Sequence, residues 1–317
     1  MVLSASRIKT YLHCSKIYYN TYVLGMRDIN GGNDGARRGT ITHLVLELLL
    51  KPRHQKYIYQ ILKSSASKVR PIQKLIEKHA KILGVNDKDN LDLIDSFIKV
   101  GLESDYFCDG YDLQPAEWHF TIDNESPRYK IGGFLDKHAF AKDGGPSRID
   151  DYKTSKNKFS GKDKDFNIQA LTYGLALWKL KGIKEVDVNF LFLKFKRQPW
   201  QKYSYNEDHF KGYEYFLGNL YSYLENFDYK KSKSNYGADK VETFRLCGGL
   251  PGDLKADGSP AWVCSYKQPF IYFELKNPDG KIVQTHMKRE ELEPKVKEGW
   301  ELNERFYAGC ERFHRGL

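Results

Sequence analysis

Apolar residues recur along the chain in two spacings, and these predict its helices and strands. Helical spacing occurs over residues 4–24, 40–50, 166–180 and 209–227, whereas alternating or β-rich runs occur over 115–123, 129–140, 148–153 and 186–196. The resulting order of helix, strands, helix and strand predicts an α/β fold with a mixed central β-sheet flanked by helices.

Two further regions extend this pattern. Apolar stripes over 56–65, 71–83 and 90–107 predict a helical insertion at about 53–108, between the second helix and the strands. Beyond residue 201 we expect a helix at 209–227, strands within 262–275 and a closing helix over 289–312. We therefore expect a core over 1–200 and a C-terminal α+β extension over 201–317 that packs on it.

The stretch from Tyr129 to Lys153 predicts a β-hairpin, with its turn at Asp143-Gly144-Gly145-Pro146. Because side chains alternate along a strand, Asp151 and Lys153 should face one side, whereas Asp150 and Tyr152 face the other.

Asp136, on the partner strand, is expected beside Asp151. Two carboxylates and a lysine on one face favour a divalent cation, and the lysine can reach a phosphate or a water. The alternative is a solvated salt bridge, which is the usual role of Asp-x-Lys on an exposed strand.

Other polar residues share faces of predicted elements. Gly39, His43 and Glu47 are spaced four apart on one helix, so His43 is either a packed core histidine or a ligand for the same site. Gln169 and Tyr173 share a face of the helix over 166–180 and either line the surface or reach into the site. Glu117 either contributes to the site or is an exposed strand glutamate, and we favour the second interpretation.

Composition narrows the class of protein. Of the 317 residues, 40% are hydrophobic and 29% are charged, which is typical of a globular protein. No apolar run approaches the length of a membrane span, and the first residues lack the apolar core of a signal peptide, so we expect a cytoplasmic protein (the host cytoplasm if it is viral). Five scattered cysteines fit a reducing compartment.

The net charge of +10 favours a polyanionic partner, above all nucleic acid. One basic cluster, which includes Lys156 and Lys158, begins at Lys153, so these lysines are candidate nucleic-acid contacts.

Five motifs, in order over about residues 3–196, are together unusual. They are Leu3-Ser4-Ala5-Ser6-Arg7-Ile8 with Cys14-Ser15-Lys16 and Tyr18-Tyr19, Gly39 to His43 with Glu47, Gly133-Phe134-Leu135-Asp136, Asp150-Asp151-Tyr152-Lys153-Thr154, and Gln169 with Tyr173. In these motifs the chain resembles the PD-(D/E)XK nuclease superfamily, specifically the RecB-like exonucleases of phages, CRISPR systems and helicase–nuclease complexes.

The resemblance implies a restriction-endonuclease-like core and a set of roles. His43, Asp136 and Asp151 would ligate Mg²⁺ or Mn²⁺ with the Tyr152 carbonyl, and Lys153 would orient or help deprotonate the attacking water. Gln169 and Tyr173 would contact nucleic acid near the scissile phosphate. Hard oxygen ligands suit Mg²⁺, in agreement with these roles.

Several relatives of this kind hold an iron–sulfur cluster on a first-helix cysteine and three C-terminal cysteines. Here Cys14 fits, but Lys267 stands where a second cysteine is expected after Cys264, and Ser15 replaces a common proline. Cys247 and Cys310 are widely spaced along the chain. We therefore expect free cysteines and no cluster.

The resemblance thus implies a metal-dependent DNA exonuclease that leaves 5′-phosphate products in phage-type recombination, repair or DNA processing. Its substrate would be linear duplex or single-stranded DNA. The chain has no Gly-x-x-x-x-Gly-Lys-Ser/Thr loop, so we expect that it does not couple to ATP itself. An exonuclease that forms an oligomer, or one that works with a recombination partner such as a single-strand annealing protein, is consistent with this expectation.

Three alternatives remain open at this point. The first alternative is a structure-specific or restriction-type endonuclease. The second is a non-catalytic DNA-binding subunit that keeps the nuclease fold, and the third is a basic scaffold protein in which the motifs are coincidental. The presence of His43, Asp136, Asp151 and Lys153 together argues against a non-catalytic subunit.

Overall fold

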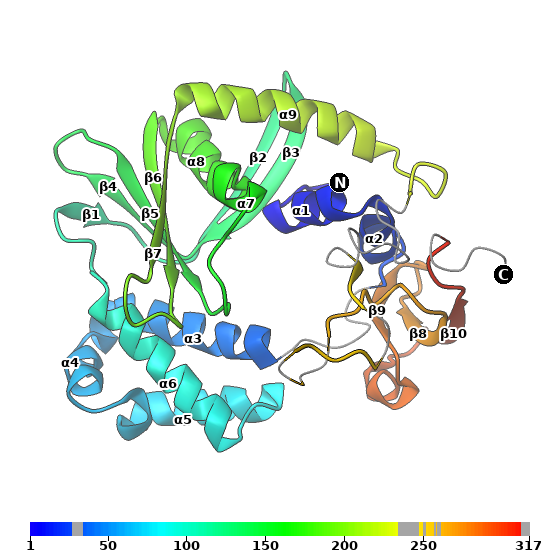
Figure 1. Cartoon of the computed structure of the whole chain (residues 1–317), viewed down its shortest axis with the longest axis horizontal. Helices are drawn as coiled ribbons and strands as arrows, with labels where there is room; N and C mark the ends of the chain where they lie inside the picture. The colour runs from blue at the N-terminus through cyan, green and yellow to red at the C-terminus, as the bar shows by residue number, and fades with distance from the viewer. Residues whose placement is uncertain (27–33, 234–246, 250–251, 257, 259–260, 312–317) are drawn as a thin grey trace. The chain divides into compact units, whose positions relative to one another are not determined.

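The computed structural model describes residues 1–26, 34–233, 247–249, 252–256, 258 and 261–311. The chain divides into two compact units (Figure 1). Unit 1 comprises Met1–Ala5 and Gly32–Ser222, and unit 2 comprises Ser6–Gly31 and Tyr223–Leu317. The expected boundary near residue 200 stays a prediction about how the chain divides into domains.

Unit 1 is built around a mixed sheet, as the sequence predicts. Its strands among the described residues are β1 (Tyr111–Leu113), β4 (Lys137–Ala141), β5 (Ser147–Lys153), β6 (Glu185–Phe192) and β7 (Trp200–Asn206), in the order β1-β4-β5-β6-β7. β5 and β6 are parallel, and the other neighbours are antiparallel. The central strands β5 and β6 are largely buried, so the sheet is covered by helices.

Helices pack on both faces of this sheet. The helices of unit 1 are α3 (Asp34–Leu50), α4 (Lys56–Lys63), α5 (Arg70–Leu83), α6 (Lys88–Glu103), α7 (Lys162–Asp165), α8 (Ile168–Lys181) and most of α9 (Glu207–Glu225), with 3-10 turns at Pro52–His54 and Ala66–Lys68. The apolar core of α3 to α6 includes Tyr152 and Leu191, which lie on the sheet face opposite Asp151. α8 contacts the Asp151 face through Gln169 and Tyr173.

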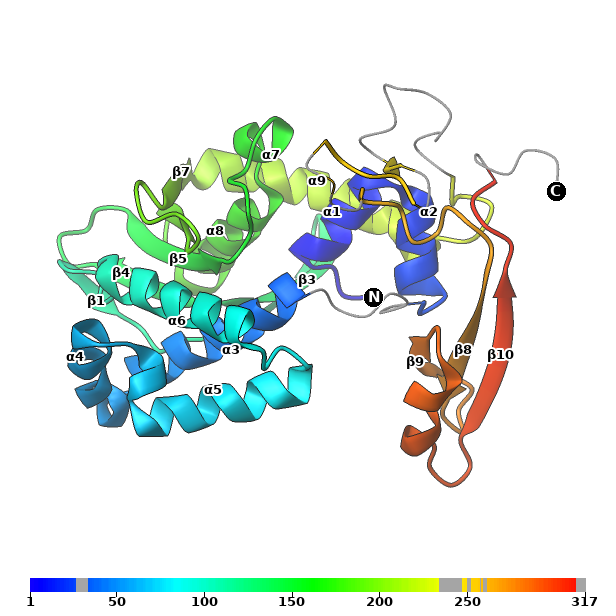
Figure 2. The ribbon, with the colours of Figure 1, turned by 60° about the horizontal axis from the view of Figure 1, so that its bottom comes forward.

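The expected helical insertion is confirmed, since α4, α5 and α6 occupy the three predicted stretches. Figure 2 shows them beside α3. The helix predicted from Thr40 begins earlier, at Asp34, whose carboxylate favours a helix N-terminus. Residues 31–33 of the expected loop lie outside the described residues.

The expected hairpin from Tyr129 to Lys153 is only half right. The hairpin consists of β4 and β5, whereas β3 (Arg128–Leu135) pairs with β2 (Trp118–Glu125) in a separate two-stranded sheet. Gly133 permits this pairing, because a Cβ there would lie 3.0 Å from the Phe120 ring. The chain therefore changes sheets at Asp136.

Unit 2 joins the N-terminal helices to a small sheet. Its elements are α1 (Ala5–His13), α2 (Ser15–Tyr18), a π-helix (Tyr19–Val23), 3-10 turns at Arg289–Glu291 and Glu293–Lys295, and the strands β8 (Phe270–Lys276), β9 (Ile282–His286) and β10 (Glu301–Tyr307). The strands form an antiparallel sheet in the order β10-β8-β9 (Figure 2). The helix expected over 4–24 is interrupted at Cys14, where the backbone is extended.

The prediction of a closing helix over 289–312 is wrong. After the two 3-10 turns the chain runs as strand β10, which pairs with β8 from Glu301 to Tyr307. Pro294 and Gly299, with φ of +74° at the glycine, interrupt helical structure there. Within the described ranges, none of the helices combines the length and apolar character needed to cross a bilayer.

Candidate active site

Three segments of unit 1 meet at Asp136. Nδ1 of His43, on α3, lies 3.2 Å from Oδ2 of Asp136, which sits between β3 and β4. The backbone N–H of Tyr152, on β5, donates a 2.9 Å hydrogen bond to the same oxygen. The structure thus brings a helix, a strand junction and a central strand to one carboxylate.

Close approach of α3 to the end of β5 depends on Gly39. A Cβ at this position would lie 3.0 Å from Oγ1 of Thr154, and the Thr154 hydroxyl donates to the carbonyl oxygen of Gly35 at 3.4 Å. One helical turn later, His43 faces the same end of the strand. Glu47 pairs with Lys51 at 2.8 Å.

Asp151 and Lys153 share one face of β5, as the alternation predicts. Nζ of Lys153 lies 2.5 Å from Oδ2 of Asp151, whose side chain is buried. This close ion pair with the Lys153 ammonium offsets part of the cost of burying the Asp151 carboxylate.

The other face of β5 carries a structural ion pair. Asp150, with 0% relative exposure, accepts from Nε of Arg148 at 2.8 Å and Nδ2 of Asn189 at 3.0 Å, and it lies 2.9 Å from Nζ of buried Lys137. This network satisfies Asp150 fully and fixes the backbone next to Asp151.

Gln169 and Tyr173 contact Asp151. Nε2 of Gln169 donates to Oδ1 of Asp151 at 3.0 Å, and the Tyr173 hydroxyl donates to the same oxygen at 2.9 Å. Asn167 caps α8 by accepting from the N–H groups of Gln169 and Ala170. The two side chains therefore hold one oxygen of Asp151; their predicted contact with nucleic acid stays a prediction.

The interpretation of Glu117 as an exposed strand glutamate is wrong, because Glu117 is half-buried, precedes β2 and lies at the site. Its carboxylate and the ligand atoms of His43 and Asp136 all lie within 4.8 Å of one another. The pairing of Trp118 with Leu135 places Glu117 opposite Asp136, and the Glu117 N–H donates to the Asp136 carbonyl at 3.2 Å. Glu117 has a φ of +55°, an uncommon value for a non-glycine residue that often marks a functional site.

Recognition that residues 115–123 pair with residues 129–135 would have revealed this position. A strand pairing in this register puts the residue before Trp118 level with Asp136.

The charges of the cluster shift one another. Burial lowers the pKa of His43, but the attraction and hydrogen bond of Asp136, together with Asp151, outweigh it and raise the pKa to about 9. Burial raises the pKa of Asp136, but the attraction and hydrogen bond of His43 lower it by more. The net pKa of Asp136 therefore lies below its usual range.

Two more carboxyl groups are shifted upward. Burial raises the pKa of Asp151, Lys153 opposes the rise, and Asp136 adds to it. Burial and then repulsion from Asp136 raise the pKa of Glu117. Carboxylates whose charged forms are disfavoured by burial and by each other are stabilised by a cation.

The residues present fit Mg²⁺ or Mn²⁺. Carboxylate oxygens and an imidazole nitrogen are suitable donors for these ions, and the cluster of His43, Glu117 and Asp136 offers three. Asp151 is not part of this cluster, although its charge acts on His43. The Tyr152 carbonyl stays a predicted ligand.

The predicted basic contacts lie in the loop after β5. Lys156 is exposed, whereas Nζ of Lys158 donates to the carbonyl oxygens of Gln198 and Trp200. Lys158 therefore connects this loop to the start of β7 by hydrogen bonds. A role of Lys156 and Lys158 in nucleic-acid binding stays a prediction.

Four of the five cysteines converge in unit 2. Burial raises the pKa of the Cys264 thiol to about 11, and Cys14, Cys247 and Cys310 each add to the rise. The Cys264 N–H also donates to the Cys247 carbonyl at 3.0 Å. None of these described cysteines forms a disulfide, and Cys108 belongs to unit 1, where its thiol donates to Oδ2 of Asp150.

Because the four cysteines converge, their wide spacing along the chain is no longer an argument against an iron–sulfur cluster. Four thiolates are a donor set that iron–sulfur clusters use. Lys267, at the position where a further cysteine is expected, stabilises the local backbone by hydrogen bonds. Its Nζ donates to the carbonyl oxygens of Gly248 and Gly249, at 2.7 Å each, and so holds the turn after Cys247. The absence of a cluster stays a prediction.

Comparisons with known proteins place the chain in a family. Among solved structures, a candidate exonuclease from Eubacterium rectale is 11% identical over 80% of this chain and 91% of its own, with a TM-score of 0.45. The structure of SSO0001 is 21% identical over 59% of this chain and 87% of its own, with a TM-score of 0.28. Both scores are too low to carry an argument.

A search of curated proteins finds no match to this chain. The profile of the PD-(D/E)XK nuclease superfamily, however, matches residues 2–248, which span all the site residues described above. The chain belongs to the PD-(D/E)XK nuclease superfamily.

Proposed function

We propose that this nuclease is a metal-dependent DNA exonuclease that hydrolyses phosphodiester bonds and leaves 5′-phosphates. The observation that carries the proposal is the meeting of His43, Glu117 and Asp136 in one cluster, with the Asp151–Lys153 pair on the adjoining strand. Nitrogen and oxygen donors beside a lysine suit metal-assisted hydrolysis of a phosphate.

Each residue has a separate role in this proposal. His43, Glu117 and Asp136 would hold a divalent cation, with Asp151 supplying a further carboxylate oxygen. Such a cation would polarise the phosphate and make a neighbouring water more acidic. Lys153 would orient the attacking water and offset charge on the phosphate oxygens.

Gln169 and Tyr173 would orient Asp151. Both donate to Oδ1, which leaves Oδ2 to face Lys153 and the cation. The carboxylate would then be held in one rotamer before substrate arrives, and such preorganisation lowers the cost of reaching the transition state.

The choice of DNA, of exonucleolytic cleavage and of a role in phage-type recombination or repair rests on the RecB-like motifs and the net charge of +10. The test is digestion of matched linear and covalently closed circular DNA with Mg²⁺ or Mn²⁺. We expect loss of the linear DNA alone, with 5′-phosphorylated products that a 5′-phosphate-dependent ligase accepts. Cleavage of the closed circle would instead identify an endonuclease, and binding of DNA without any cleavage would identify a non-catalytic subunit.

A further inference from the structure

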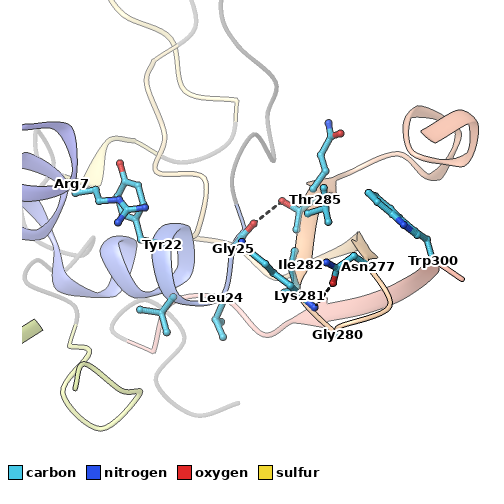
Figure 3. A pocket seen from close by; sticks show the side chains of 13 residues that line it. Arg7, Tyr22, Leu24, Gly25, Asn277, Gly280, Lys281, Ile282, Thr285 and Trp300 are labelled. Atoms are coloured by element: carbon cyan, nitrogen blue, oxygen red, sulfur yellow. Dashed lines mark hydrogen bonds between the residues drawn. The ribbon is translucent and has the colours of Figure 1, made fainter. Parts of the chain in front are cut away.

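Unit 2 contains a pocket of about 1040 Å³ that takes no part in the site of unit 1. Arg7 and the segment from Tyr22 to Gly25 form one wall, and Asn277, residues 280–285 and Trp300 form the other. Figure 3 shows Arg7 beside Tyr22 at one end and Trp300 at the other, with Leu24, Gly25 and Ile282 between them.

The two walls are fixed to each other. The Thr285 hydroxyl donates to the Gly25 carbonyl at 3.3 Å, and the Tyr266 hydroxyl donates to the Met26 carbonyl at 2.5 Å. Gly25 has a φ of +71°, and a Cβ there would lie 3.3 Å from Cγ2 of Ile282, so glycine permits this close approach. The pocket is therefore a built part of unit 2, and a ligand would find it already formed.

The lining carries two basic side chains and two aromatic rings beside four aliphatic residues. It includes Arg7 and Lys281 and contains neither aspartate nor glutamate among the described residues. The Arg7 guanidinium lies 5.1 Å from the centroid of the Tyr22 ring, and Nζ of Lys297 lies 5.3 Å from that of Trp300. A site without carboxylates does not suit a metal ion or a basic peptide; its charge is complementary to an anion.

The mixture of side chains points to the kind of anion. Cations that track a phosphate backbone, together with aromatic rings on which bases stack, are the means by which proteins hold single-stranded nucleic acid. The side-chain amide of Gln284 adds a donor for base edges, whereas the Asn277 amide and the Thr285 hydroxyl already bond Asp279 and the Gly25 carbonyl. The volume slightly exceeds the range of about 300–1,000 Å³ for small-ligand pockets, which leaves room for more than one nucleotide.

We propose that this pocket binds a segment of single-stranded DNA and is an accessory strand-binding site of the nuclease. The choice of DNA rests on the proposed function. Arg7 and Lys281 contact backbone phosphates, and Trp300 stacks on a base.

The test is the binding of a fluorescein-labelled thymidine 20-mer to the full chain in EDTA, measured by anisotropy over a series of salt concentrations. The variants are Lys281→Ala and Trp300→Ala, singly and combined. Lys288→Ala is the matched control, because Lys288 is also exposed in unit 2 but does not line the pocket. Trp300→Phe retains an aromatic ring, and thermal melts identify any variant that is not folded.

We expect Lys281→Ala to reduce the slope of log K against log salt by about 0.7, the value for one phosphate contact on a single strand. Trp300→Ala should weaken binding about 5- to 150-fold, and Trp300→Phe should recover most of the loss. Lys288→Ala should leave the affinity within twofold. Wild-type affinity and salt slope in the combined variant, or equal losses in the control, would overturn the proposal.

Failure of this inference is distinguishable from failure of the proposed function. If the wild-type protein degrades linear DNA while the pocket variants bind the 20-mer normally, the pocket inference is wrong and the nuclease proposal stands. If binding depends on Lys281 and Trp300 but the protein cleaves no DNA, the strand site stands without the exonuclease.

Discussion

The Tyr173 hydroxyl donates a 2.9 Å hydrogen bond to Oδ1 of Asp151. Gln169 donates to the same oxygen, so the two residues orient the carboxylate. A hydrogen bond to a charged group contributes about 1.5–3 kcal/mol. Tyr173→Phe should therefore lower the cleavage rate about 10- to 150-fold with unchanged DNA affinity.

Tyr213→Phe is the matched control for this substitution. The Tyr213 hydroxyl is also buried and forms a 2.8 Å hydrogen bond with the hydroxyl of Thr172, the residue before Tyr173. It forms no hydrogen bond with Asp151 among the described residues. Single-turnover cleavage at saturating DNA separates the two variants. Equal rates would contradict an orienting role for Tyr173, and a loss of affinity would favour direct contact with nucleic acid.

Glu117→Gln tests whether Glu117 helps to hold the cation. The substitution keeps the shape of the side chain but removes the charge, so Mn²⁺ affinity should fall about 10- to 100-fold, as is common for residues that support a metal site. Titration followed by the electron paramagnetic resonance signal of free Mn²⁺ measures this affinity. Glu125→Gln, an exposed residue at the far end of β2, should have no effect. Equal Mn²⁺ affinity in both variants would exclude Glu117 from the site.

Lys137→Met tests the buried network behind the site. Removal of Lys137 leaves Asp150 with Arg148 and Asn189 but without its closest ammonium partner, so we expect a loss of about 3–5 kcal/mol in the free energy of unfolding. Urea denaturation measures the change. Lys130→Met breaks an exposed pair with Asp123 and should cost less than about 1 kcal/mol. Similar losses in the two variants would show that the buried pair contributes no more than a surface pair.

Gly174→Ala tests the packing of α8, which carries Gln169 and Tyr173. A Cβ at Gly174 would lie 2.4 Å from the Phe210 ring, so we expect destabilisation by about 1–3 kcal/mol. Gly212→Ala, on α9, meets no atom within 4 Å and should stabilise the protein by up to about 1 kcal/mol, because alanine favours helix. Thermal melts that move in the same direction for both variants would contradict this account.

Local rules predicted much of this molecule. The alternation along β5 placed Asp151 with Lys153 and Asp150 with Tyr152, and the four-residue spacing on α3 placed His43 toward the site. These features depend on the repeat of a single strand or helix, which the order of residues determines directly.

Features that depend on pairing between distant segments were not predictable in the same way. Glu117 reaches the site only because β3 pairs with β2, and the sequence interpretation assigned β3 to the following hairpin. The stretch over 289–312 forms a strand because β8 is present to pair with it. The four cysteines of unit 2 converge although their spacing along the chain is wide.

In the proposed function, Asp151, beside the cluster of His43, Glu117 and Asp136, is required for metal-dependent cleavage. The most direct measurement compares Asp151→Asn with the wild type for degradation of end-labelled linear DNA in Mg²⁺, and for DNA affinity in EDTA. We expect the variant to lose cleavage and to bind DNA as tightly as the wild type. Undiminished cleavage by the variant would contradict the proposed function.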